Sequence, residues 1–350
     1  MALSDNEIEM IRAELLSSQR PLIFFHDDPD GLASFLLVYR FLQRGFGVVV
    51  KANPKIDAKF LRKVEEYQPD KIFVLDIAMV DQEFIDSAGV PVVWVDHHAP
   101  LERKNILYFN PRVSVPEDNF PVTHTCYRVV RDSIPADVWI GAVGCVGDWF
   151  LPEFMDDFCK KYPHLIASEI NTPDDALFNS KLGELVRIFS FILVGTVSDA
   201  MRCVKILTRV EGPDELLYQK NAAAKYVMKK YLSAKRQYDV VLNQALKEHV
   251  DDGELFVFTY SGDVSFTKDL ANELQYKFPE KIIVVGRDKS GEIKMSIRAK
   301  GKIIPPVLDK ALIGIEGYGG GHEYACGACV NKKDFKRFLE NLKNAFDGKI

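Results

Sequence analysis

Acidic and imidazole side chains follow three short apolar runs in the first hundred residues. The runs cover residues 22–25, 72–75 and 92–95, and they lead into His26-Asp27-Asp28-Pro29-Asp30-Gly31, into Asp76, and into Asp96-His97-His98. Runs of this length that are rich in Val, Ile or Phe are typical of buried strands. In an open α/β sheet the ligand crevice lies beyond the carboxyl ends of the strands. We therefore expect these side chains to converge at one edge of a sheet.

A cluster of carboxylates cannot sit together as bare charges, because mutual repulsion and desolvation would be severe. Divalent cations relieve the repulsion. A donor set of Asp oxygen and His nitrogen without thiolate favours Mn²⁺, with Fe²⁺, Co²⁺ or Mg²⁺ as alternatives, over a structural zinc site. The donors suffice for two ions about 3.5–4 Å apart, which suits displacement at phosphorus.

Each of these residues also has a structural interpretation. A single Asp is often a helix cap or a turn residue, and a lone His is more often structural than a ligand. The number of acids and imidazoles in compact polar motifs favours the metal site. His124, His164 and His249 lie outside such motifs and are expected to be structural.

The elements that must position these residues form an α/β pattern. Helical segments at 32–43, 57–67 and 81–87 alternate with the apolar runs, which predicts βαβ units and a doubly wound, mainly parallel sheet covered on both faces. Residues 121–250 are mostly helical in pattern. Strand signals return at 255–260, 281–287 and 292–298, with helices at 268–276 and 332–346. We expect a catalytic domain at 1–205, a helical connector at 206–252 and a smaller α/β domain at 253–350, with the active site in the cleft between the domains.

Composition narrows the class of protein. The chain has 350 residues, 47% hydrophobic and 27% charged, which is typical of a folded protein and allows two domains. Its formal net charge of −5 argues against a protein that coats a long duplex. Contact with nucleic acid should therefore be confined to a few nucleotides.

The compartment is expected to be the cytoplasm. The sequence contains no stretch of about 18 apolar residues, so it predicts no membrane span. The N-terminus reads as an acidic amphipathic helix, not as a signal peptide. The six cysteines show no disulfide-framework spacing, and we interpret the Cys326/Cys329 pair as packing and not as a zinc or redox site.

At these motifs the sequence resembles the DHH phosphoesterase family, closest to its RecJ-like nucleases. The resemblance is carried by His26-x-Asp28-x-Asp30-Gly31, Asp76, Asp96-His97-His98 and Gly147-Asp148. The last part of the chain is similar to the DHH-associated C-terminal domain, through Ser296-x-Arg298 and Gly319-Gly320-Gly321-His322. The match covers nearly the whole chain, and the motifs occur in the expected order.

The resemblance implies roles for individual residues. The metal ligands would be His26, Asp28, Asp30, Asp76, His97 and Asp148, with Asp76 as the bridge. The catalytic set would be Asp76, Asp96, His97 and His98, in which Asp96 supports a ligating His and His98 contacts the scissile phosphate. Arg298, Gly319, Gly320, Gly321 and His322, with His98, would hold the substrate.

These expectations point to a two-metal phosphoesterase, with Mn²⁺ as cofactor and Mg²⁺ or Co²⁺ as substitutes. The preferred activity is an exonuclease that converts short oligonucleotides or single-stranded ends to mononucleotides. The alternatives are a nucleotide phosphatase, a cyclic-dinucleotide phosphodiesterase, or a non-catalytic scaffold in a DNA-processing complex. The expected partner is nucleic acid or a nucleotide and not a membrane; a homodimer and DNA- or RNA-processing partners stay open.

Overall fold

The computed structural model describes residues 2–51, 55–166 and 169–348. The chain divides into two compact units, the first ending at Leu232 and the second beginning at Ser233. This boundary lies inside one long helix, α12 (Ala222–Glu248). Each unit has its own sheet and its own apolar core.

The N-terminal unit is built on a five-stranded sheet with the order β2-β1-β4-β6-β7. All neighbouring strands in it are parallel. The strands are β1 (Pro21–His26), β2 (Phe46–Val50), β4 (Lys71–Leu75), β6 (Val92–Val95) and β7 (Leu107–Phe109). The doubly wound parallel sheet predicted from the sequence is confirmed, whereas β7 was not predicted.

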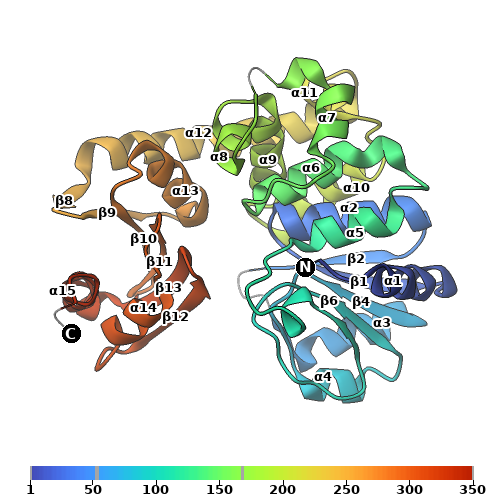
Figure 1. The fold of residues 1–350 in the computed structure, drawn as a ribbon, viewed down its shortest axis with the longest axis horizontal. Helices are drawn as coiled ribbons and strands as arrows, with labels where there is room; N and C mark the ends of the chain where they lie inside the picture. Colours follow the sequence, from blue (N-terminus) through green and yellow to red (C-terminus); the bar gives the residue numbers. More distant parts are fainter. Residues whose placement is uncertain (1, 52–54, 167–168, 349–350) are drawn as a thin grey trace. The chain divides into compact units, whose positions relative to one another are not determined.

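Helices cover both faces of this sheet, as expected for strands joined by βαβ crossovers. Figure 1 shows α2 and α5 over one face and α3 and α4 over the other. The helices near the sheet are α1 (Asp5–Ser17), α2 (Pro29–Leu42), α3 (Leu61–Tyr67), α4 (Gln82–Ser87), α5 (Val122–Val130) and α6 (Val138–Gly147). Strands β3 (Lys55–Ile56) and β5 (Met79–Val80) form a separate two-stranded parallel sheet.

The rest of this unit is helical, which confirms the pattern predicted after residue 121. It contains α7 (Met155–Lys161), α8 (Pro173–Phe178), α9 (Lys181–Ile192), α10 (Val197–Leu207), α11 (Pro213–Leu217) and the first part of α12. Throughout the described ranges, every helix is too short or too polar to cross a membrane.

The C-terminal unit has a six-stranded sheet with the order β12-β13-β11-β10-β9-β8. Strands β9 and β10 are parallel, joined by a crossover through α13, and the other pairs are antiparallel. The elements are β8 (Val250–Asp252), β9 (Leu255–Ser261), α13 (Thr267–Lys277), β10 (Ile282–Lys289), β11 (Glu292–Ala299), α14 (Pro305–Ala311), β12 (Gly317–His322), β13 (Ala325–Asn331) and α15 (Phe335–Phe346). The smaller α/β domain predicted here is confirmed.

The winding of the N-terminal sheet determines where a ligand can bind. The chain runs from β1 outward to β2 and then returns to place β4 on the other side of β1. Ligands of open α/β sheets bind where the strand order reverses in this way, beyond the carboxyl ends of the strands. Here that point lies between β1, which ends at His26, and β4, which is followed by Asp76.

Candidate metal centre

The turn between β1 and α2 brings His26 and Asp28 together. His26 is the last residue of β1, and Asp28 is the N-cap of α2, with its Oδ1 accepting from Gly31 N at 3.0 Å. The other carboxylate oxygen, Asp28 Oδ2, lies 3.1 Å from His26 Nδ1. Gly31 permits this turn, because a Cβ there would meet the His26 carbonyl oxygen at 2.5 Å. Asp28 therefore serves as a helix cap and still faces the imidazole.

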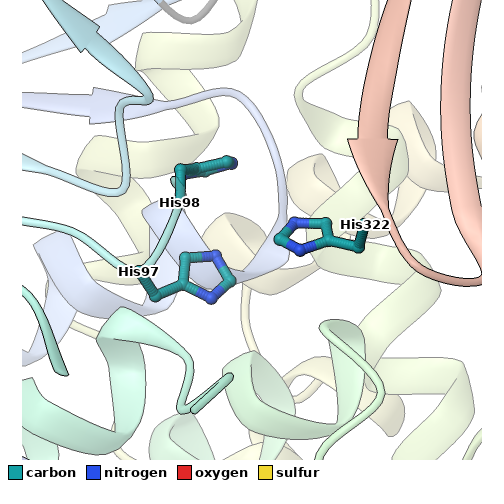
Figure 2. A group of neighbouring side chains, drawn as sticks. All are labelled: His97, His98 and His322. Atoms are coloured by element: carbon teal, nitrogen blue, oxygen red, sulfur yellow. The ribbon is translucent and has the colours of Figure 1, made fainter. Parts of the chain in front are cut away.

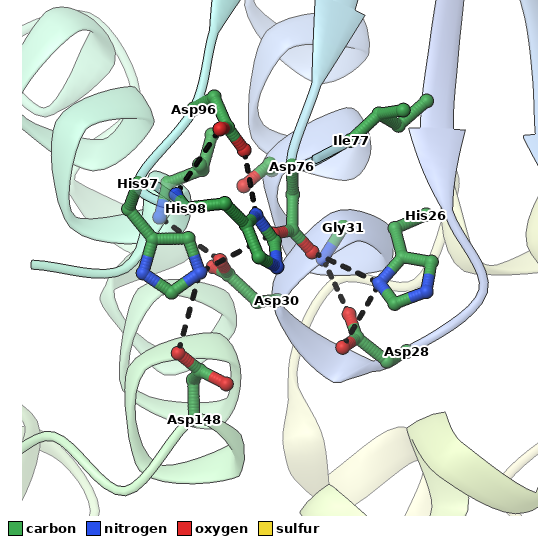
Figure 3. Close-up of polar contacts among 12 residues, drawn as sticks. His26, Asp28, Asp30, Gly31, Asp76, Ile77, Asp96, His97, His98 and Asp148 are labelled. Atoms are coloured by element: carbon green, nitrogen blue, oxygen red, sulfur yellow. Dashed lines mark hydrogen bonds and ion pairs between the residues drawn. The ribbon is translucent and has the colours of Figure 1, made fainter. Parts of the chain in front are cut away.

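Asp76 lies at the centre of the cluster (Figure 3). Its backbone φ of 57° is in the left-handed region, which Asp tolerates better than most residues. Asp76 Oδ2 is 3.4 Å from His26 Nδ1, and Asp76 Oδ1 is 3.4 Å from His97 Nε2. The carboxylate is buried, and Oδ2 has no hydrogen-bond partner among the described residues. One oxygen of Asp76 thus faces each of two imidazoles.

The segment after β6 presents Asp96, His97 and His98. Asp96 is buried and accepts from His98 twice, from the backbone N at 3.1 Å and from Nδ1 at 2.8 Å. Asp96 therefore orients His98. Figure 2 shows His97 and His98 on this segment and His322 at the end of β12. The rings of His97 and His98 meet edge to face, with centroids 4.7 Å apart.

Asp30 is held by a helix that begins far along the chain. Its two carboxylate oxygens accept from Val122 N at 2.9 Å and Thr123 N at 2.7 Å, in the first turn of α5. These amides are unpaired within the helix and carry the positive end of its dipole, so they stabilise the ionised carboxylate. A carboxylate oxygen has more than one lone pair, so these bonds leave acceptor capacity for a cation. Burial, with the charges of Asp76 and Asp148, raises the pKa of Asp30.

Asp148 reaches the cluster from the carboxyl end of α6. It is the C-cap of that helix, and its Oδ2 is 3.6 Å from His97 Nε2. Two glycines let α6 approach closely. A Cβ on Gly144 would lie 2.2 Å from Thr123 Oγ1, and one on Gly147 would lie 2.6 Å from Pro29 Cβ. Gly147 is the last residue of α6, and Asp148 follows it as the cap.

The donors fall into groups whose atoms lie within 4.8 Å of one another. His26, Asp28 and Asp76 form one group, and Asp30, His97 and Asp148 form another. A third combines Asp76, Asp96 and His98. Figure 3 shows the first group on one side of Asp76 and His97 with Asp148 on the other.

The negative charges of the carboxylates around the imidazoles favour bound cations at this position. Burial lowers the pKa of His97, but the charge of Asp148 and the hydrogen bond and charge of Asp76 outweigh it and raise that pKa to about 10. Burial likewise opposes protonation of His26, while Asp28 and Asp76 raise its pKa well above the ordinary value. Protons on these rings balance the carboxylates in the metal-free chain. Oxygen and imidazole donors without thiolate fit divalent cations such as Mn²⁺.

Apart from His98, the residues that the sequence predicts to hold the substrate lie in the C-terminal unit. Arg298, on β11, donates from Nε to Asn272 Oδ1 at 2.7 Å. Ser296 faces the same side and bonds Thr267 at 3.1 Å. Gly319, Gly320, Gly321 and His322 belong to β12, which is the edge strand of the sheet and is largely exposed.

The interpretation of Cys326 and Cys329 as packing has a structural basis. Both lie on β13, three residues apart, so their side chains project to opposite faces of the strand. Cys326 Sγ lies near the His322 carbonyl, and Cys329 Sγ lies near Glu292. Both thiols are buried, which raises the pKa of each. This geometry does not suit a shared metal ion. Glu323, for which the sequence suggested no role, is exposed, and its backbone oxygen accepts from Ile304 N.

Sequence reasoning missed Asn110. This residue follows β7 and is buried, and its Nδ2 donates to the His98 carbonyl at 3.0 Å and contacts Tyr108 Oη at 2.7 Å. It therefore fixes the backbone of the segment that carries His97 and His98. The signal was available, because Asn110 is a polar residue at a strand end like the others. The three-residue strand before it is too short to form a recognisable apolar run.

Comparison with known proteins identifies both parts of the chain. The DHH family N-terminal domain matches residues 20–126, and the DHHA1 domain matches residues 257–348. No curated protein sequence matches the chain.

Solved structures share the fold. RecJ from Thermus thermophilus in complex with Mn²⁺ superposes with a TM-score of 0.72 at 14% identity, over 99% of this chain and 55% of that one. An exonuclease RecJ bound to manganese gives 0.63 at 15% identity, over 99% and 95%. The DHH domain of a member of the s1p family of ribosomal proteins gives 0.67 at 13% identity, over 97% and 89%. The present chain thus spans about half the length of the Thermus RecJ chain.

The two domain matches occur in order, and together with the shared fold they agree with the placement of the acidic and imidazole motifs at the sheet edge. The chain belongs to the DHH family of phosphoesterases, with a DHH domain followed by a DHHA1 domain.

Proposed function

We propose that this chain is a phosphodiesterase that depends on two divalent cations, preferably Mn²⁺, and releases mononucleotides from short oligonucleotides or single-stranded ends. The observation that carries the proposal is the position of Asp76. Its two oxygens each lie 3.4 Å from an imidazole of a different donor group. A carboxylate placed in this way can bridge two ions.

His26, Asp28 and Asp76 would hold one ion, and Asp30, Asp76, His97 and Asp148 would hold the other. Such ions supply charge neutralisation for the phosphate and acidify a bound water. Hydrogen bonds to backbone amides hold the carboxylates of Asp28 and Asp30 in place before substrate arrives. RecJ structures of similar fold contain Mn²⁺ or Mg²⁺, which supports a divalent cation at this position.

His98 would contact the scissile phosphate. Its Nδ1 bonds Asp96, which fixes the ring orientation and assigns Nε2 to the substrate. Asn110 Nδ2 donates a hydrogen bond to the backbone carbonyl of His98. A residue that is fixed through one ring nitrogen and through its backbone can meet a phosphate oxygen with little further loss of conformational freedom, which favours the productive geometry.

The C-terminal unit would hold the remainder of the substrate. A guanidinium binds phosphate bidentately, and Arg298 is positioned through Nε by Asn272. The glycines of β12 allow backbone to approach a ligand closely, and His322 ends that strand. We assign a non-scissile phosphate or base to this set.

Short substrates fit the charge of the chain. A protein that binds a long strand must neutralise many phosphates, whereas the formal net charge here is −5. A nucleotide phosphatase or cyclic-dinucleotide phosphodiesterase would use the same metal centre and is the second candidate. A non-catalytic scaffold does not need a set of metal donors, and the groups of donors in this chain therefore support an enzyme.

A substrate panel tests the proposal. The purified chain, in Mn²⁺, is given end-labelled dinucleotides, longer RNA, longer DNA, phosphoadenosine phosphate and cyclic dinucleotides. We expect mononucleotide release to be fastest from the dinucleotides and to stop with EDTA. Exclusive cleavage of the cyclic or monophosphate substrates would replace the exonuclease assignment, and inactivity on all of them would support a scaffold.

A further inference from the structure

Helix α6 ends in a specific hydrogen-bonded turn directly after Asp148. Phe150 N donates to Cys145 O at 3.0 Å, and Trp149 N donates to Val146 O at 3.1 Å. These two bonds define a Schellman motif, whose residue after the cap must adopt the left-handed conformation. That residue is Trp149, with φ of 60°.

Glycine is the usual residue at this position, because it has no Cβ to clash. A bulky side chain there is a true outlier and costs folding free energy. The turn itself does not need an indole, since glycine would form it with less strain. The presence of Trp149 therefore requires a role for its side chain.

Packing in the core is the first role to consider. Trp94 and Trp139, which pack in the core, are both fully buried. Trp149 differs, because it is partly exposed. Its ring meets Phe178 edge to face, with centroids 6.4 Å apart, which is a peripheral contact. This contact orients the indole without burying it.

The backbone of Trp149 directly follows Asp148, a residue of the metal centre. Consecutive Cα atoms are about 3.8 Å apart, and Asp148 Oδ2 lies 3.6 Å from His97 Nε2. A nucleotide that binds the metal centre by its phosphate needs a surface for its base, and Trp149 lies one residue from that centre. Aromatic side chains bind bases of any sequence by stacking on their faces.

We propose that Trp149 is a nucleobase-stacking residue for the nucleotide whose phosphate occupies the metal centre. The inference rests on the proposed function and adds the base to what that site recognises. It explains why a strained position beside a metal ligand carries the largest side chain. Stacking is tolerant of base identity, so Trp149 would contribute affinity and not sequence preference.

The test compares two probes that differ only by the base, adenosine 5′-monophosphate and ribose 5-phosphate, each with Mn²⁺. Because Trp94 and Trp139 are buried, a change in tryptophan fluorescence reports mainly on Trp149. We expect the adenosine probe to quench the fluorescence and the ribose probe to leave it unchanged. In Trp149→Phe the signal should disappear, while calorimetry should still detect binding of the adenosine probe.

Trp149→Gly removes the stack and relieves the backbone. We expect it to bind the adenosine probe about tenfold more weakly or worse, with unchanged affinity for Mn²⁺ and ribose 5-phosphate and no loss of thermal stability. Trp149→Asn, which also tolerates the left-handed conformation, should behave alike and serves as the second variant. Absence of quenching in the wild type, or equal loss of both probes in the variants, would overturn the stacking role.

These outcomes can be separated from the proposed function. Quenching by the adenosine probe in a chain that releases no mononucleotide from dinucleotides would retain the stacking role and reject the exonuclease. Release from dinucleotides with the same KM in wild type and Trp149→Gly would retain the exonuclease and reject the stacking role.

Discussion

The glycines of the 319–321 motif differ in their surroundings. At Gly320 an added Cβ would meet no atom within 4 Å in the C-terminal unit, whereas at Gly321 it would lie 2.4 Å from Ala325 O at a φ of 150°. Gly320→Ala should therefore change the free energy of unfolding by less than about 0.5 kcal/mol and still lower kcat/KM on a dinucleotide. Gly321→Ala should lose about 1–3 kcal/mol of stability. Chemical denaturation and steady-state kinetics on both variants check this, and a stable Gly320→Ala with full activity would exclude close substrate approach.

Arg298 should act on substrates that have a second phosphate. Removal of its guanidinium in Arg298→Ala should lower kcat/KM on a dinucleotide by roughly ten- to a hundredfold, because a charged hydrogen bond is worth about 1.5–3 kcal/mol. Hydrolysis of a phosphomonoester and Mn²⁺ affinity should change little. Arg287 is a matched control on the neighbouring strand β10, where it bonds the Asp263 carbonyl. Equal losses of kcat/KM on both substrates would mean that Arg298 has a structural role. An equal loss in Arg287→Ala would show that the effect is not specific to Arg298.

Metal binding should release protons. The raised pKa of His97, about 10, means that this imidazole is protonated near neutral pH in the metal-free chain. A metal ligand must be the neutral ring, so Mn²⁺ displaces the proton, and affinity should rise with pH until the folded pKa is passed. Calorimetry of Mn²⁺ binding in two buffers with different ionisation enthalpies measures the released protons. An affinity independent of pH, with no proton release, would contradict the assignment of His97.

Among the elements, α6 determines where Asp148 lies, and Gly144 lets that helix approach Thr123. Gly144→Ala would place a Cβ 2.2 Å from Thr123 Oγ1, so the helix must move. We expect a loss of about 1–3 kcal/mol in the free energy of unfolding, together with weaker Mn²⁺ binding. Gly212→Ala is the control, since its added Cβ would have only Tyr162 Oη nearby, at 3.8 Å. Unchanged stability and Mn²⁺ affinity in Gly144→Ala would show that close packing of α6 does not matter to the site.

The elements that the sequence predicted were those with strong local signals. Strand β1 ends in His26, and β4 and β6 are each followed directly by an Asp. The parallel arrangement of these strands followed from the intervening helices. The edge strand β12 was not predicted, because its glycines form no apolar run. Local patterns also could not show that Asp30 is held by Val122 N and Thr123 N, because those amides lie more than 90 residues away.

At the scale of the molecule, the chain has two apolar cores, and the boundary between their two units lies inside one continuous helix. The sequence predicted two α/β domains joined by a helical connector at 206–252, and α12 lies within that span. The helix crosses the boundary between the compact units and buries side chains in each, including Tyr231 and Tyr238. A helix with a regular apolar stripe gives no local sign of the point at which its packing partner changes. The proposed division of labour assigns metal binding to the first unit and substrate holding to the second.

The most direct test of the account is the number and coupling of Mn²⁺ ions at saturation, measured by electron paramagnetic resonance. The wild-type chain should bind two ions with the magnetic coupling of a carboxylate-bridged pair. Asp76→Asn keeps the size and left-handed tolerance of the residue but weakens the bridge, so it should bind at most one ion without coupling. A single uncoupled ion in the wild type, or an unchanged coupled pair in Asp76→Asn, would contradict a two-ion centre built on Asp76.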